Sequence, residues 1–175
     1  MRLINSSNLS FEEFFDPEVP PYAILSHTWS PGQEVSFQDY RRILRGKPSP
    51  ARQSSGYAKI VETCKIAVED HIPYVWVDTC CIDKSSSAEL TESINSMFRW
   101  YKESKVCYVH LVDLGPHDSL GSTLAHCRWV TRGWTLQELL APTLSTSSTI
   151  PGSIVVVGQS ISKSYPPPPE STRTF

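Results

Sequence analysis

The amino-acid sequence predicts an α/β domain in three layers, with a parallel β-sheet flanked by helices. Short apolar runs rich in strand-forming residues alternate along the chain with longer segments whose apolar residues recur every three or four positions. One run, Tyr74–Val77, is apolar without interruption, which is typical of a strand covered on both faces. Strands that alternate with helical segments pair in parallel through right-handed crossovers, so both observations favour this class.

Five segments have the composition of β-strands. The second of them follows Pro17, Pro20 and Pro21, which break any helix that precedes it. The expected strands are Met1–Asn5, Tyr22–Ser26, Tyr74–Val77, Val106–Leu111 and Ile154–Val157.

Two long helices are expected between these strands. Tyr57–His71 has an apolar stripe, and its polar face carries Lys59. The second helix begins at Ser86, three residues before Glu89, which is the spacing of a capping box. Its expected buried stripe is Leu90, Ile94, Met97, Phe98 and Tyr101. Shorter helices are expected within Gln33–Arg45 and Arg128–Pro142, with a mobile surface loop at Gly46–Gly56.

The length of the chain favours a single domain, and its charge favours neither nucleic acid nor an anionic membrane as a partner. The 175 residues carry 16 basic and 18 acidic side chains, a formal charge of -2. This balance gives no attraction to nucleic acid or to an anionic membrane. No apolar stretch approaches the ~20 residues of a membrane-spanning helix, and the first fifteen residues lack the apolar core of a signal peptide. We therefore expect a cytoplasmic protein without a membrane span and without a nucleic-acid partner.

Cysteine usage agrees with a cytoplasmic protein. The five cysteines are odd in number and lie mostly in apolar segments, as buried free thiols do. His117, His126 and Cys127 lack the regular spacing of zinc ligands. We expect no disulfide framework, no metal site and no bound cofactor.

The candidate functional residues are polar side chains at strand ends and helix starts. The common motifs of nucleotide-binding folds, hydrolases and metalloproteases are absent from the sequence. The carboxyl ends of the strands in an open α/β sheet border the ligand crevice, so polar residues there can line one site. The candidates are Ser26, His27, Trp29, Asp78, Cys80, Asp83, Arg128, Arg132 and Glu138.

Each candidate also has a purely structural alternative. Asp78 can cap a turn, and His27 can be a half-buried ring with a backbone partner. Glu138 has capping-box spacing and can simply close a helix end. Cys80 or Cys127 would act as a nucleophile only beside a base. The residues alone leave these alternatives open.

Three blocks of the sequence resemble the fungal heterokaryon-incompatibility (HET) domain. They are YAILSHTW at Tyr22–Trp29, VWVDTCCIDK with SINSMFRWY within Val75–Tyr101, and RGWTLQELLAP at Arg132–Pro142. The blocks occur in the family's order, and the resemblance covers residues 1–142, the expected HET domain. It implies an effector of fungal non-self recognition and programmed cell death. The implied partners are further copies of the chain or other HET- and NACHT-type signalling proteins.

The HET family is distantly similar to Toll/interleukin-1-receptor (TIR) domains, which have a flavodoxin-like parallel sheet and some of which cleave NAD. Trp134–Leu139 is similar to the TIR pattern around the catalytic glutamate, with Thr135 in place of a cysteine. The resemblance implies that Glu138 is catalytic and that NAD is a substrate. The implied substrate-binding residues are Ser26, His27, Trp29 and Asp78. The alternative is a non-catalytic death-signalling module that acts through self-association.

The last part of the chain departs from the family pattern. Thr143–Phe175 is rich in serine and proline and includes four consecutive prolines. We expect residues 143–175 to form a divergent, largely disordered tail, with Ser160–Phe175 disordered throughout. The resemblance then implies a flavodoxin-like sheet that is incomplete at its C-terminal side.

Overall fold

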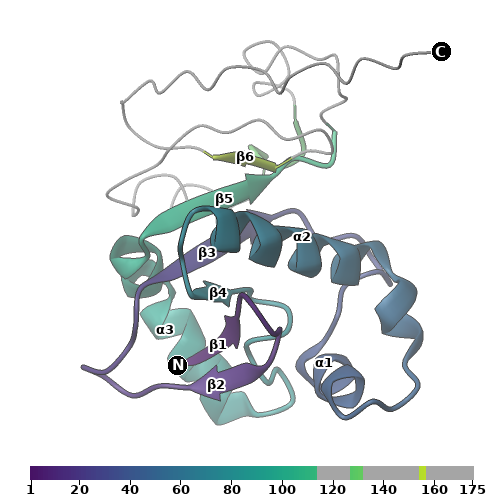
Figure 1. The fold of residues 1–175 in the computed structure, drawn as a ribbon, viewed down its shortest axis with the longest axis horizontal. Helices are drawn as coiled ribbons and strands as arrows, with labels where there is room; N and C mark the ends of the chain where they lie inside the picture. The colour runs from purple at the N-terminus through teal and green to yellow at the C-terminus, as the bar shows by residue number, and fades with distance from the viewer. Residues whose placement is uncertain (114–126, 132–153, 157–175) are drawn as a thin grey trace, which may run out of the picture.

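A computed structural model of the chain describes residues 1–113, 127–131 and 154–156, which form one mixed β-sheet with helices against it (Figure 1). The strands lie in the order β2-β1-β4-β3-β5-β6. Their bounds are Arg2–Asn5 (β1), Phe11–Glu13 (β2), Tyr22–His27 (β3), Tyr74–Trp76 (β4), Val106–His110 (β5) and Ile154–Val156 (β6). The predicted α/β class and all five expected strands are confirmed.

Only the centre of the sheet is parallel. β3 pairs in parallel with β4 on one side and with β5 on the other. β1, β2 and β6 join by antiparallel pairing, so the prediction of a wholly parallel sheet is wrong. The physical reason is clear for β1 and β2, because the five residues between them permit a hairpin but no crossover.

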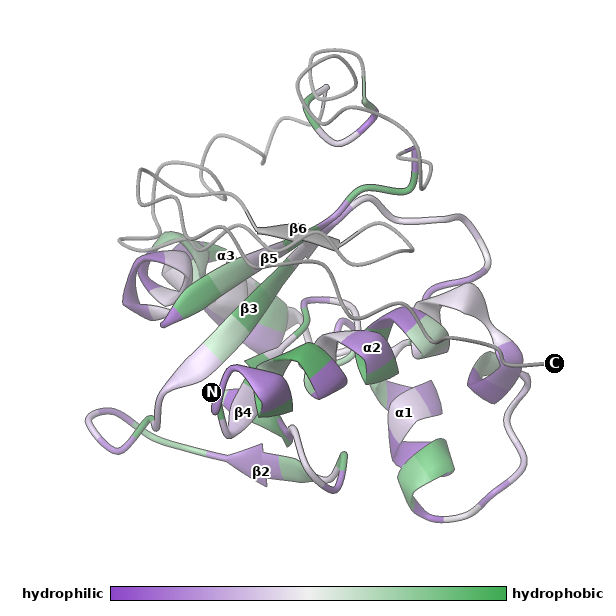
Figure 2. Cartoon of the chain, turned by 45° about the horizontal axis from the view of Figure 1, so that its top comes forward, coloured by the Kyte–Doolittle hydropathy of each residue, from purple (hydrophilic) through white to green (hydrophobic). Residues whose placement is uncertain are grey.

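The helices cover opposite faces of this parallel centre. The β3–β4 connection contains α1 (Phe37–Leu44), a 3-10 turn (Pro50–Gln53) and α2 (Ser55–Glu69). The β4–β5 connection contains α3 (Ser87–Glu103) and runs back across β3. Right-handed crossovers in opposite directions place their helices on opposite faces. Figure 2 shows α2 and α3 on the two sides of β3 and β5.

Helix starts follow the sequence closely. The side chains of Ser36, Ser54 and Ser86 accept hydrogen bonds from backbone N–H groups at the starts of α1, α2 and α3. The predicted start at Ser86 is confirmed. However, Glu89 accepts from the backbone N–H of Asp83 at 2.8 Å, so its carboxylate fixes the preceding loop. The expected loop at Gly46–Gly56 contains the 3-10 turn and the beginning of α2.

The buried face of α3 differs from the predicted stripe. Tyr101 is buried, but Ile94 is 44% exposed and Phe98 is 50% exposed. Trp100 and Tyr101 pack edge-on against Trp76 of β4. These two rings fix the rotation of the helix about its axis, which turns Ile94 and Phe98 outward.

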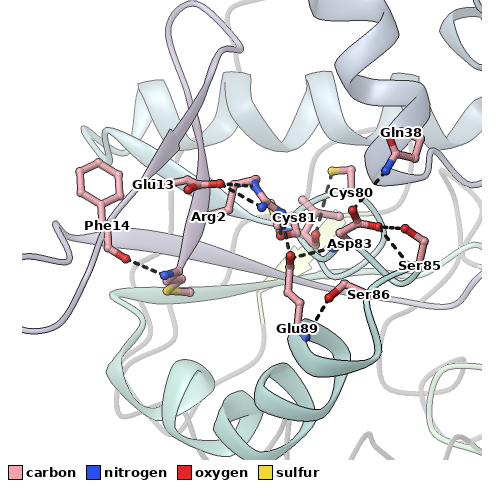
Figure 3. A network of polar contacts seen from close by, with 12 residues as sticks. Arg2, Glu13, Phe14, Gln38, Cys80, Cys81, Asp83, Ser85, Ser86 and Glu89 are labelled. Atoms are coloured by element: carbon pink, nitrogen blue, oxygen red, sulfur yellow. Dashed lines mark hydrogen bonds and ion pairs between the residues drawn. The ribbon is translucent and has the colours of Figure 1, made fainter.

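Arg2 ties the N-terminal hairpin to the rest of the domain (Figure 3). Its Nε and Nη2 donate to Glu13 Oε1 at 3.0 and 2.9 Å. Its Nη1 donates to Glu89 Oε1 at 2.9 Å and to the backbone oxygen of Cys81 at 3.0 Å. The guanidinium carbon also lies 4.0 Å from the centre of the Phe37 ring in α1. One side chain thus joins β2, α1 and the loop before α3.

We expect Arg2→Ala to lower the free energy of unfolding by about 1–3 kcal/mol, because it removes several charge-assisted hydrogen bonds from a mostly buried guanidinium. Denaturant unfolding measures this change. Arg52→Ala, at an exposed position of the 3-10 turn, is the matched control and should stay within about 0.5 kcal/mol of wild type. Equal stabilities for all three proteins would contradict the role of Arg2.

Candidate functional site

A polar cluster lies at the carboxyl end of the sheet, where β3, β4 and β5 end. In Figure 2, β3 and β5 change from hydrophobic to hydrophilic colouring at this end. The register pairs His27, the last residue of β3, with His110, the last residue of β5. Asp78 follows β4 two residues after its last residue. The polar cluster comprises His27, Trp29, Glu34, Lys59, Asp78 and His110.

The Asp78 carboxylate is held by two residues of the β3 exit. Its Oδ1 lies 2.9 Å from His27 Nε2, and its Oδ2 accepts from Trp29 Nε1 at 3.1 Å. An ionised carboxylate only accepts hydrogen bonds, so His27 Nε2 is the donor. Three predicted substrate-binding residues therefore meet in one hydrogen-bonded unit. The His27 ring is only 2% exposed, whereas Trp29 is 47% exposed at the mouth of the cluster.

A second carboxylate lies on the other side of the His27 ring. Glu34, in the loop before α1, places Oε2 at 3.8 Å from His27 Nδ1. Its Oε1 accepts from Lys59 Nζ at 2.9 Å and from the backbone N–H of Ser30 at 2.8 Å. Lys59 is buried, although the periodicity of the helix sequence predicts that it lies on the polar face. Burial of a lysine needs such a partner, because an isolated buried ammonium is costly.

Gly56 allows the loop that carries Glu34 to approach α2. A Cβ atom at this position would lie 2.3 Å from the backbone oxygen of Gln33. The Gly56 N–H instead donates to that oxygen at 3.2 Å. The contact holds the loop beside the first turn of α2, on the same helix as Lys59.

His110 is kept neutral by its surroundings. Burial, the positive charge of Lys59 and the neighbouring His27 lower the pKa of His110 to about 4, against a partial opposing effect of Glu34. Its ring is therefore uncharged at neutral pH and can offer a hydrogen-bond acceptor.

Buried polar atoms without partners gather at the carboxyl end of the sheet. Within the part of the chain that the structure describes, six buried side-chain atoms make no hydrogen bond. Four of them belong to residues at the ends of the parallel strands or in the turns after them. These atoms are His27 Nδ1, Thr28 Oγ1, Thr79 Oγ1 and His110 Nδ1. Because such groups are nearly always paired with protein, water or ligand, their position marks a place where a polar ligand would be accepted.

Ser26 lies apart from the polar cluster. Successive residues of a strand point to opposite faces, so Ser26 and His27 face opposite sides of β3. The Ser26 hydroxyl accepts from Trp129 Nε1 at 2.6 Å, and both side chains are buried. This contact attaches residues 127–131 to the end of β3. Glu138 and Arg132 lie outside the described residues, so the predicted catalytic role of Glu138 stays a prediction.

The remaining candidates have other environments. Asp83 accepts from Gln38, and the backbone N–H of Arg128 donates to Asp113. All five cysteines are buried. Burial raises the pKa of the Cys80 thiol, so it remains protonated and the nucleophile alternative has no support at this position. No metal-binding group of three or more side chains occurs among residues 1–113, 127–131 and 154–156.

Two grooves lined by described residues lie away from the polar cluster. One, of about 610 Å³, lies at the amino end of β3 beside Tyr22 and Lys105. The other, of about 390 Å³, lies beside Arg2 and Trp76. We place the candidate site at the polar cluster because it combines unpaired buried polar atoms with the carboxyl ends of parallel strands. In the described part, none of the helices is long and apolar enough to span a bilayer.

Glu34, Lys59 and His110 were missed by sequence reasoning. Glu34 and Lys59 lie on a loop and a helix whose polar residues carry no distinguishing spacing. His110 had a usable signal, because it ends a predicted strand as His27 does.

The low pKa of His110 predicts acid-sensitive stability. The unfolded chain binds a proton at this histidine near pH 6.5, whereas the folded chain binds it only near pH 4. Stability should therefore fall as the pH drops through this window, by about 3 kcal/mol in total. His110→Asn should remove this part of the pH dependence in denaturant unfolding. An NMR titration that places the His110 pKa near 6.5 would contradict this prediction.

Comparison with known proteins identifies the family. Residues 22–123 match the family described as "Heterokaryon incompatibility protein (HET)". Over 134 residues the chain is 49% identical to vegetative incompatibility protein HET-E-1 of Podospora anserina. This alignment covers 72% of the chain and 9% of HET-E-1, and no solved structure matches the chain. The sequence blocks and the family match agree, and the chain belongs to the heterokaryon incompatibility (HET) family.

Proposed function

We propose that this HET domain is an effector of fungal non-self recognition that triggers programmed cell death by cleaving NAD at the carboxyl end of its sheet. The observation that carries the proposal is the hydrogen-bonded unit of His27, Trp29 and Asp78. Incompatibility as the biological setting is supported by the relative HET-E-1, whose name describes a vegetative incompatibility protein.

The polar cluster has the properties that a nucleotide-cleaving site needs. Asp78 is fixed by two donors, and His27 lies between it and Glu34, so the acidic groups keep their positions without a ligand. Cleavage of the bond between nicotinamide and ribose develops positive charge on the ribose. A prearranged carboxylate stabilises that charge more in the transition state than in the ground state.

The strand order at the parallel centre of the sheet also supports a ligand site at the carboxyl ends of these strands. The chain leaves β3 toward β4 on one side, then crosses to β5 on the other side. Ligands of open α/β sheets bind outside the carboxyl ends of strands where the winding direction reverses. In the proposal, Glu138 supplies the catalytic carboxylate, as its resemblance to the TIR pattern implies, while Asp78 and Trp29 contact the substrate and His27 positions Asp78.

A second candidate function is a non-catalytic module that signals death through self-association. The outward position of Ile94 and Phe98 on α3 favours it, because these two apolar side chains offer a contact surface. The two functions differ in whether the protein turns over NAD.

We expect the purified chain to release nicotinamide from NAD, and Glu138→Gln to lower the rate by about 100-fold or more, the usual effect of losing a group that stabilises a transition-state charge. Chromatography of nicotinamide measures the rate. Glu92→Gln, at an exposed carboxylate of α3, is the matched control and should act like wild type. Equal release by wild type and Glu138→Gln would refute a catalytic Glu138. Full killing of fungal cells by Glu138→Gln would favour the non-catalytic module.

A further inference from the structure

Positive charge is concentrated at the end of α1 and in the segment that joins it to α2. Five basic side chains, which we call the basic patch, are Arg41, Arg42, Arg45, Lys47 and Arg52. No acidic residue occurs from position 40 to position 61. The rest of the chain carries 11 basic and 18 acidic side chains, a formal balance of -7. The overall charge of -2 therefore conceals a local excess of positive charge.

The chain turns sharply after α1, which brings members of the basic patch together. Gly46 has a φ of +66°, a conformation that glycine adopts without a Cβ clash. Its N–H donates to the backbone oxygen of Ile43 at 3.0 Å, and the N–H of Lys47 donates to that of Arg42 at 3.0 Å. These two bonds are the pattern of a Schellman motif, which ends a helix. Lys47 is thereby folded back toward the last turn of α1.

The charges of the basic patch have no acidic partner among the described residues. None of the five side chains forms an ion pair within the described ranges. The exposed members are Arg42, Arg45, Lys47 and Arg52. The negative end of the α1 dipole accounts for arginines in its last turn, but Lys47 and Arg52 lie beyond that turn. Helix stabilisation therefore does not explain the whole patch.

An exposed apolar side chain lies among these charges. Leu44, the last residue of α1, is 40% exposed, whereas Phe37, Tyr40 and Ile43 anchor the buried face of the helix. In Figure 1, α1 and the segment after it lie at the edge of the molecule, on the side away from α3. The basic patch and Leu44 thus belong to one outer surface of the domain.

We propose that the basic patch and Leu44 dock the domain on a membrane that contains anionic phospholipids. Negative headgroups attract each lysine or arginine near the bilayer, and clusters of four to eight such residues are typical of lipid-binding segments. Leu44 gains by leaving water for the boundary between headgroups and acyl chains.

Nucleic acid is the other polyanion that such a patch could attract. Proteins that bind single strands stack the bases on exposed aromatic side chains, and residues 41–55 contain no aromatic residue. The exposed leucine among the charges favours the lipid surface. This inference is independent of NAD cleavage, because it concerns a different surface from the polar cluster.

Sedimentation of the full chain with lipid vesicles tests the proposal. One set of vesicles contains phosphatidylserine in phosphatidylcholine, and the other contains phosphatidylcholine alone. We expect wild type to bind only the first set and to be released when the salt concentration rises from about 0.1 M to about 1 M. Arg45→Gln combined with Lys47→Gln should weaken binding by about 20-fold or more. Leu44→Ser should weaken it by about threefold or more.

The matched control combines Lys102→Gln with Lys105→Gln. It removes two exposed lysines near the end of α3 and has the same net charge as the double variant of the patch. It should bind vesicles like wild type, and a thermal melt of each variant checks that it is folded. Equal weakening by both double variants would overturn the proposal, as would wild type that binds no anionic vesicles.

A DNA oligonucleotide separates lipid from nucleic acid as the partner. We expect it to bind more weakly than the anionic vesicles at the same salt concentration. Tighter binding of DNA that Leu44→Ser leaves unchanged would overturn the proposal and assign the basic patch to nucleic acid. Because no NAD is present in these measurements, their outcome is separate from that of the proposed function.

Discussion

The hydrogen bond between His27 and Asp78 is the interaction on which the candidate site depends. It joins the exits of two neighbouring parallel strands, because β3 and β4 pair from Tyr22↔Tyr74 to Ile24↔Trp76 and residues 27 and 78 follow at the same end of the sheet. The His27 ring is buried, so it contacts its neighbours from a fixed position. Asp78 is thereby held beside Trp29, which is 47% exposed.

Side chains from a loop, from α2 and from the ends of two strands form a chain of polar contacts around His27. Lys59 pairs with Glu34, Glu34 lies beside one nitrogen of His27, and Asp78 binds the other nitrogen. Such an arrangement is costly to bury and is easily replaced by apolar packing where only stability matters. Unpaired buried atoms at Thr28 and His110 add to that cost. A polar ligand at this end of the sheet gives a physical reason for both features.

Sequence patterns predicted the parts of the fold that depend on local composition. Apolar runs located the strands, and the capping-box spacing at Ser86 located the start of α3, because both signals act within a few residues. Antiparallel pairing of β1 with β4 depends on contacts distant in sequence, and no local pattern encodes it. The rotation of α3 was missed because Trp100 and Tyr101 compete with Ile94 and Phe98 for the sheet, and their contacts with Trp76 decide the outcome.

The residues of the candidate site likewise include some that the sequence predicts and some that it does not. His27, Trp29 and Asp78 were predictable because polar residues directly after apolar strands occupy one end of a parallel sheet. Glu34 and Lys59 were not, because the direction of a polar side chain on a loop or helix is set by its partner across the structure. The sequence also did not predict the role of Gly56, since that role follows from one close backbone contact.

We propose the polar cluster at the carboxyl end of the sheet as the ligand site of this HET domain. Mapping oxidised NAD onto the isotope-labelled protein by NMR tests it most directly. We expect the Trp29 indole signal and the backbone signals of residues 27–30 and 78–79 to shift, and we expect Asp78→Asn to remove these shifts. Shifts confined to the groove beside Tyr22 and Lys105 would contradict it, as would a spectrum that NAD leaves unchanged.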